Sequence, residues 1–131
     1  MPDASPFRTW NGVEAWEFVD GVHLHAIGGE QVLVCRVTYA PGKQVPDHAH
    51  ADSEQVMVVV DGSVTMTIEG ETRDLEVGDV VVVNRGLRHS LVSRDGVTFF
   101  EALAPVPLDH VPDRARDLVL GRDGGSGHVQ R

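Results

Sequence analysis

The sequence predicts an all-β fold, either a sandwich or a barrel, because its composition and its turn spacing both favour many short strands. The 131 residues include 14 glycines and 7 prolines, with valine-rich runs between them, a composition typical of β-rich domains with tight turns. No stretch has convincing helical periodicity apart from a possible short helical turn over residues 112–118. The length favours a single domain, which we place at residues 1–120, followed by a flexible glycine-rich tail at 121–131.

The predicted strands are apolar or alternating runs that end at turn residues. They cover residues 13–19, 22–27, 31–39, 55–60, 63–68, 71–75, 80–84, 89–92 and 98–104. Residues 55–60 and 80–83 are apolar on both faces, which is expected for strands buried between sheets or at a dimer contact. Asp61-Gly62 and Glu69-Gly70 are each predicted to form a two-residue hairpin turn.

Charge and cysteine content exclude several classes of protein. The net charge is -9 and the 11 basic residues are scattered, whereas binding to nucleic acid requires clustered Lys and Arg. The single cysteine, Cys35, excludes an internal disulfide, suits a reducing compartment and is expected to pack in the core. The sequence starts without a basic and apolar leader, and its apolar runs are too short to span a membrane. We therefore expect a soluble cytoplasmic protein.

Three histidines and one nearby amide or carboxylate form the strongest candidate site. His48 and His50 stand two apart on a segment that Pro46 favours as extended, so their side chains share a face as two neighbouring metal ligands require. Glu54 and Gln55 are adjacent, and a strand points adjacent side chains to opposite faces, so only one of them can join the histidines. With His89 the set would nearly complete the coordination of one divalent transition metal: Zn, Ni, Mn or Fe.

At these positions the sequence resembles the cupin superfamily. The first cupin motif runs Gly, five residues, His-x-His, three or four residues, Glu, six residues, Gly. Gly42 and the two histidines match it, and Gln55 is separated from Gly62 by the required six residues. The resemblance therefore implies Gln55 rather than Glu54 as the metal-facing residue.

The second cupin motif runs Gly, five residues, Pro-x-Gly, two residues, His, three residues, Asn. Gly78, Gly86 and His89 match it, with Asn84 where proline is usual and Ser93 where asparagine is usual. The two motifs together imply a double-stranded β-helix, also called a jelly-roll barrel. They also imply a metal held by His48, His50, Gln55 and His89. The apolar sheet faces and the N-terminal strands lead us to expect a homodimer.

The layout is nearest to that of small single-domain cupins that ring-open unsaturated uronates. Those proteins have an Asp and a Phe two residues apart on the last strand, and then an Arg after a proline-rich bend. Here Glu101, Leu103 and Pro107 stand at these positions. Glu101 can serve as a carboxylate base, while a rim carboxylate paired with an arginine is an equally open interpretation.

The expected substrate pocket combines residues of three strands. Its candidates are Arg36, Tyr39, Met57, Phe99 and Leu103. Arg36 interrupts an apolar strand, so it either meets a substrate anion or points to solvent from a sheet face.

These residues favour a metal-dependent isomerase, cyclase or lyase that acts on a small oxygen-rich metabolite, with Glu101 as the base. The alternatives are an Fe(II) dioxygenase and a non-catalytic module that binds a small ligand. A second His-x-His pair, His23 and His25, has no partner at ligand spacing and is not expected to bind metal.

Overall fold

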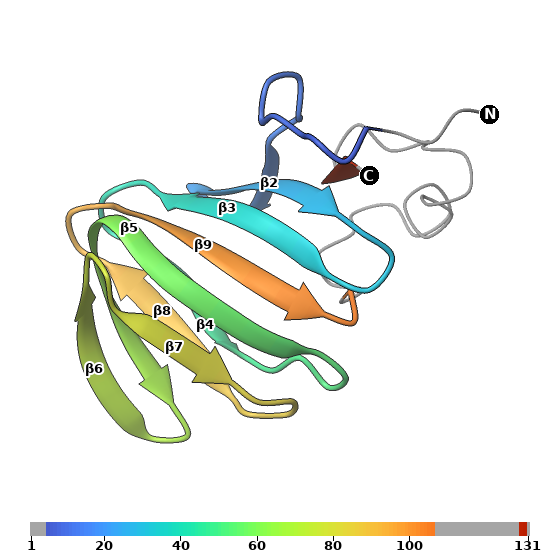
Figure 1. Cartoon of the computed structure of the whole chain (residues 1–131). Coiled ribbons are helices and arrows are strands. Elements are labelled where there is room, and N and C mark those ends of the chain that lie inside the picture. The colour runs from blue at the N-terminus through green and yellow to red at the C-terminus, as the bar shows by residue number, and fades with distance from the viewer. Residues whose placement is uncertain (1–4, 107–128, 131) are drawn as a thin grey trace.

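The computed structural model describes residues 5–106 and 129–130 and shows two antiparallel sheets packed face to face (Figure 1). The first sheet has the strand order β1-β2-β3-β9-β5-β7, and the second has the order β6-β5-β8-β4. This is the predicted double-stranded β-helix. Its strands are β1 (Trp16–Val19), β2 (Val22–Gly28), β3 (Leu33–Tyr39), β4 (Lys43–His48), β5 (Glu54–Ile68), β6 (Glu71–Glu76), β7 (Val80–Val83), β8 (His89–Ser93), β9 (Val97–Ala104) and β10 (Val129–Gln130).

Strand β5 belongs to both sheets. Its first half pairs with β7 and β9, and its second half pairs with β6 and β8. The pairing register with β9 shifts between Val59 and Asp61, and Gly62 has a φ of 74°. The hairpin predicted at Asp61-Gly62 is therefore wrong. A glycine with positive φ can bend a strand into a second sheet as readily as it can reverse the chain.

Strand β4 is absent from the sequence prediction, which left Lys43–His48 without a strand. Among the described residues it is an edge strand that pairs with β8 alone, and its register is irregular between Val45 and His48, where Pro46 lies. Proline lacks a backbone N–H, so it is tolerated at an edge or at an irregularity. The tertiary pairing with β8 overrides the weak strand signal of this segment.

The core lies between the two sheets. Side chains alternate between buried and outward positions along β2, β3 and β9, and Cys35 is buried among them as expected. In β5 the inward Met57 and Val59 are each 1% exposed, whereas Val56 on the opposite face is 39% exposed. Val82 on β7 is 55% exposed. The outer faces of these strands are thus exposed in the part of the chain that the structure describes.

The ends of the chain are only partly described. The helical turn predicted at residues 112–118 lies outside the described residues, as does most of the tail at 121–131. Val129 and Gln130 form β10, which pairs in parallel with Ala26 and Ile27 of β2. The end of the predicted flexible tail is therefore part of the first sheet. Within the described ranges the chain forms no helix of the length and apolarity needed to cross a membrane.

Candidate metal centre

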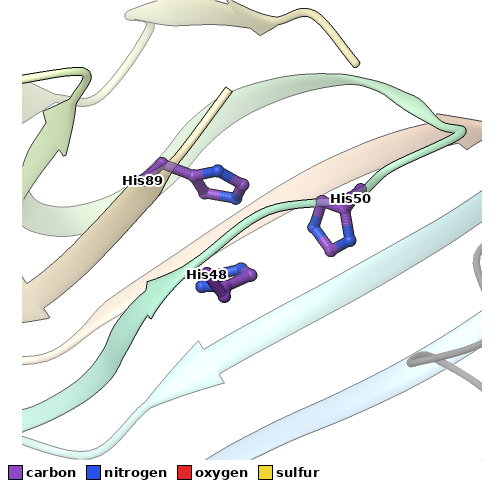
Figure 2. Close-up of side chains that lie close together, drawn as sticks. All are labelled: His48, His50 and His89. Carbon is purple, nitrogen blue, oxygen red and sulfur yellow. The ribbon is translucent and has the colours of Figure 1, made fainter. Parts of the chain in front are cut away.

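The three predicted histidines converge between the sheets. His48 ends β4 and is the register partner of His89 at the start of β8, while His50 follows in the loop after β4. Figure 2 shows the three rings turned toward one another, and one ring nitrogen from each histidine lies within 4.8 Å of the other two. His50 and His89 are 6% and 1% exposed, and His48 is half-buried. This geometry suits a single divalent ion.

Backbone carbonyls set the orientation of two of these rings. Nδ1 of His48 lies 2.8 Å from the Pro46 carbonyl oxygen, and Nδ1 of His89 lies 2.9 Å from that of Leu87. A carbonyl oxygen only accepts, so each Nδ1 carries the hydrogen and each Nε2 keeps its lone pair. Such outer contacts fix the tautomer of a metal-ligating histidine.

Gln55, and not Glu54, is the inward residue at the start of β5. Gln55 is 3% exposed and lines the same cavity as the histidines, whereas Glu54 is exposed. The Nε2 group of Gln55 donates a 3.3 Å hydrogen bond to Oε1 of Glu101, and its Oε1 has no hydrogen-bond partner among the described residues. The glycine interval of the first motif therefore selected the inward-facing residue of the two.

Two buried hydrogen-bond acceptors at this site, one on a histidine and one on Gln55, fit a metal ion. Nε2 of His89 and Oε1 of Gln55 have less than 1 Å² of exposed area and no hydrogen-bond partner in the described chain. Leaving a buried polar atom unsatisfied costs about 1–3 kcal/mol, and an imidazole nitrogen and an amide oxygen are both good ligands for divalent transition metals. With His48 and His50, these residues would hold the ion.

The pKa of His89 favours the neutral, ligating form of the ring. Burial lowers this pKa from 6.5 to about 4; the hydrogen bond with Leu87 opposes the shift, and the nearby His48 and His50 add to it. Ligating imidazoles must be unprotonated. Near pH 7 the ring of His89 is therefore ready to bind a metal.

Glu101 faces the same cavity from β9. It is 5% exposed and lines the cavity with Phe99, two residues before it, and Tyr39 of β3. The Tyr39 and Phe99 rings are 5.7 Å apart between centroids. Burial, and then the charge of Glu101, raise the pKa of the Tyr39 phenol, so Tyr39 remains neutral at physiological pH. Glu101, the residue expected from the sequence to be the base, thus contributes an inward-facing carboxylate to the cavity.

The cavity itself is small and mostly apolar. Its free space is about 20 Å³, which is room for about one water molecule or ion. It is lined by Phe18, Val22, Leu24, Val37, Tyr39, Val45, His48, His50, Gln55, His89, Leu91, Phe99 and Glu101. The sequence analysis did not identify the lining residues contributed by β1, β2 and β8. For β2 the alternation of apolar and polar side chains could have indicated them.

Three of the predicted pocket residues lie elsewhere. Met57 and Leu103 are buried in the core beside the cavity and do not line it. Arg36 lies on the outward face of β3, with its guanidinium carbon 5.5 Å from the centre of the Trp10 ring. A cation over an aromatic face is stabilised without burial. Of the two interpretations of Arg36, contact with a substrate anion or an outward position on a sheet face, this position fits the second.

Hydrogen bonds outside the cavity join the segments that carry the histidines. The Gly86 N–H donates to the His50 carbonyl at 2.9 Å, which links the two motif loops. On the surface, Nε of Arg88 donates to Oδ2 of Asp47 at 2.6 Å. Each residue of this ion pair immediately precedes a candidate ligand in the chain.

A jelly-roll barrel with this three-histidine centre defines a cupin domain. The chain belongs to the Cupin_2 family of cupin domains, which matches residues 35–100. That segment contains every candidate ligand and ends one residue before Glu101.

The chain is also similar to two named proteins. It is 31% identical over 98 residues to the pectin degradation protein KdgF of Dickeya dadantii (strain 3937), covering 72% of this chain and 88% of KdgF. It is 30% identical over 92 residues to the tetracenomycin polyketide synthase protein TcmJ of Streptomyces glaucescens, covering 66% of this chain. The chain spans only 62% of the length of TcmJ.

Solved structures share the fold at lower identity. KdgF from Halomonas sp. superimposes with a TM-score of 0.69 at 21% identity, over 73% of this chain and 91% of that protein. An RmlC-like cupin from Shewanella frigidimarina NCIMB 400 superimposes with a TM-score of 0.75 at 21% identity, over 85% of this chain and 100% of that protein. At this identity the two structures show a common fold alone.

Proposed function

We propose that this cupin is a metal-dependent isomerase, cyclase or lyase that acts on a small oxygen-rich metabolite. The observation that carries the proposal is the buried contact between Gln55 and Glu101 in the cavity of the three histidines. A carboxylate beside a metal site is the arrangement that proton transfer next to a polarised oxygen requires. The similarity to KdgF and TcmJ supports small-molecule chemistry in this family.

The roles of the residues follow from their positions. When bound, a divalent ion would supply Lewis acidity that polarises a carbonyl or enol oxygen of the substrate. Glu101 removes or returns the proton at the adjacent carbon, and the hydrogen bond from Gln55 holds the carboxylate toward the cavity. Tyr39 and Phe99 exclude water from the reacting atoms.

Proton removal can be tested before the substrate is identified. Zinc-, nickel- and manganese-loaded protein is incubated in D₂O with a panel of α-hydroxy ketones and β-diketones, and deuterium uptake beside the carbonyl is followed by ¹H NMR. We expect Glu101→Gln to slow the exchange by about 100-fold or more while the bound metal stays unchanged. Glu54→Gln, which changes the exposed neighbour of Gln55, is the control and should exchange like the wild type.

The outcomes separate the candidate functions. Exchange that survives Glu101→Gln removes this residue from the mechanism. No exchange with any compound, from protein that has its metal, favours the non-catalytic binding module over the enzyme. Substrate-dependent oxygen consumption by the iron-loaded protein favours the dioxygenase, which the three-histidine cluster also supports.

We also propose a homodimer through the outer face of the first sheet. Val82, Val56, Ala102 and Val34 are successive register partners across four strands, and the three valines are 36–55% exposed. A row of apolar side chains of this length favours burial against a second copy. Val56→Lys should yield a monomer in light scattering, while Val92→Lys, which changes a valine of similar exposure in the second sheet, should not.

A further inference from the structure

Tyr39 is a buried phenol on the wall of the histidine cavity. It ends β3, and its side chain lines the same cavity as Glu101 and the three histidines. A buried tyrosine hydroxyl ordinarily has a hydrogen-bond partner, because burial removes it from water. In the described part of the chain no group is hydrogen-bonded to this hydroxyl. A partner for it therefore has to come from whatever occupies the cavity.

The phenol oxygen of Tyr39 lies near the carboxylate of Glu101. Burial, and in addition the negative charge of Glu101, raise the pKa of the Tyr39 phenol, and a charge has a marked effect of this kind from nearby. The ring of Phe99 packs against the phenol ring, with 5.7 Å between their centroids. Because the phenol keeps its proton at physiological pH, it can donate a hydrogen bond into the cavity without giving up that proton.

A hydrogen-bond donor complements the other polar groups of the cavity, several of which are acceptors. Nδ1 of His48 and of His89 carries the ring hydrogen, so each Nε2 has a free lone pair. Oε1 of Gln55 and the carboxylate of Glu101 are acceptors as well. An oxygen of a ligand is itself an acceptor and gains nothing from these groups directly. The hydroxyl of Tyr39 offers that oxygen a donor.

We propose that the Tyr39 hydroxyl donates a hydrogen bond to an oxygen of the bound ligand, and that Tyr39 thereby selects ligands that offer an oxygen acceptor. This inference rests on the proposed metal-dependent function and deepens it by naming a residue that determines specificity. Carbonyl, enolate and carboxylate oxygens are acceptors of this kind. The hydrogen bond strengthens as negative charge develops on the accepting oxygen, while the ring of Tyr39 keeps water out.

Formate and azide test this selection in nickel-loaded protein. Both are small anions that bind divalent metals, but formate offers oxygen acceptors whereas azide offers only nitrogen. The nickel content is measured on the same sample, and visible absorption reports binding of each probe to the ion. We expect Tyr39→Phe, which keeps the ring and removes the hydroxyl, to weaken formate binding by about tenfold and to change azide binding little. Thr38→Val, which removes the hydroxyl of the exposed neighbour on β3, should change neither affinity.

A spectroscopic measurement reports on the hydroxyl directly. Tyr39 is the only tyrosine of the chain, so the tyrosine doublet in the ultraviolet resonance Raman spectrum comes from this residue alone. The doublet responds to hydrogen bonding of the phenol. We expect formate to change it toward a more strongly donating phenol in the nickel-loaded wild type, and azide to leave it unchanged. A residue that only supports the packing of the cavity would not give this difference between the probes.

The outcomes keep the role of Tyr39 apart from the function on which it rests. Protein that holds no nickel contradicts the metal-dependent function and overturns the inference with it. Nickel-loaded wild type that does not bind formate overturns the selection for oxygen ligands while the metal site stands. Equal formate affinity in the wild type and Tyr39→Phe, an equal loss of formate and azide binding in that variant, or an unchanged doublet overturns it as well.

Discussion

Gln55 and Glu101 are joined by a 3.3 Å hydrogen bond from the amide Nε2 to the carboxylate Oε1, across the pairing of β5 with β9. A carboxylate can only accept here, so the amide nitrogen must face Glu101 and the amide oxygen is left for the histidine cluster. One side chain therefore serves two groups of the site. A glutamate in its place could not donate this hydrogen bond and would set two carboxylates against each other.

Removal of the Gln55 amide should weaken the metal site. We expect Gln55→Leu to lower zinc affinity by about 10- to 100-fold, measured by isothermal titration calorimetry, because an amide oxygen is lost beside the three histidines. Glu54→Leu changes the adjacent, outward-facing residue and should leave the affinity unchanged. Equal affinities in the two variants would mean that Gln55 is not a ligand.

The stability of the metal-free protein should depend on pH through His89. Its pKa is about 4 when folded and near 6.5 when unfolded, so the unfolded state binds more protons between these values. Stability is therefore full above about pH 6.5 and falls as the pH drops toward 4. We expect His89→Gln to remove about 3 kcal/mol of this pH dependence in urea unfolding with a chelator present. His23→Gln, at a half-buried histidine of β2 that does not line the cavity, should retain it.

The bend in β5 should tolerate no side chain at Gly62. Its φ is 74°, and an added Cβ would collide with the carbonyl oxygen of Gly96. Gly70 has a similar φ of 84° with nothing within 4 Å. We expect Gly62→Ala to lower the free energy of unfolding by about 3 kcal/mol or more, and Gly70→Ala to lower it by about 1 kcal/mol. Thermal unfolding measures both. Equal losses would show that backbone conformation, and not the contact with Gly96, limits the position.

The surface ion pair near the site should matter little for stability. Asp47 and Arg88 are each 57% exposed, and exposed pairs contribute about 0–1 kcal/mol because solvent screens them. We expect a double-mutant cycle of Asp47→Ala and Arg88→Ala to give a coupling energy in this range. A coupling well above it would indicate that the pair also positions the adjacent histidines.

The convergence of the candidate ligands could be predicted because it depends on intervals along the chain. His48 and His50 share a face through strand periodicity, and the spacing from Gln55 to Gly62 selected the inward residue correctly. The arrangement of the β5 bend could not be predicted, since Asp61-Gly62 is compatible with both a hairpin and a change of sheet. The close approach of Gly62 to the backbone of Gly96 distinguishes the change of sheet from the hairpin, and these two residues are far apart in the sequence.

The other positions that could not be predicted from the sequence are those that depend on neighbours in space. Arg36 alternates correctly along β3, but its outward position is stabilised by Trp10, which comes from a separate segment. Phe18 was missed because the bulge at this residue interrupts the regular pairing that would place it on one face. Glu101 could be placed because the alternation of β9 is regular throughout.

The shared membership of β5 in both sheets also has a consequence for folding. The candidate ligands come from β4, the loop after it, β5 and β8, so the centre forms only when both sheets have closed around the core. A bound ion would cross-link these distant segments, and its binding energy would add to the cooperativity of the whole domain. Amide hydrogen exchange at β4, its weakly paired edge, should then slow with metal as much as exchange in the central strands.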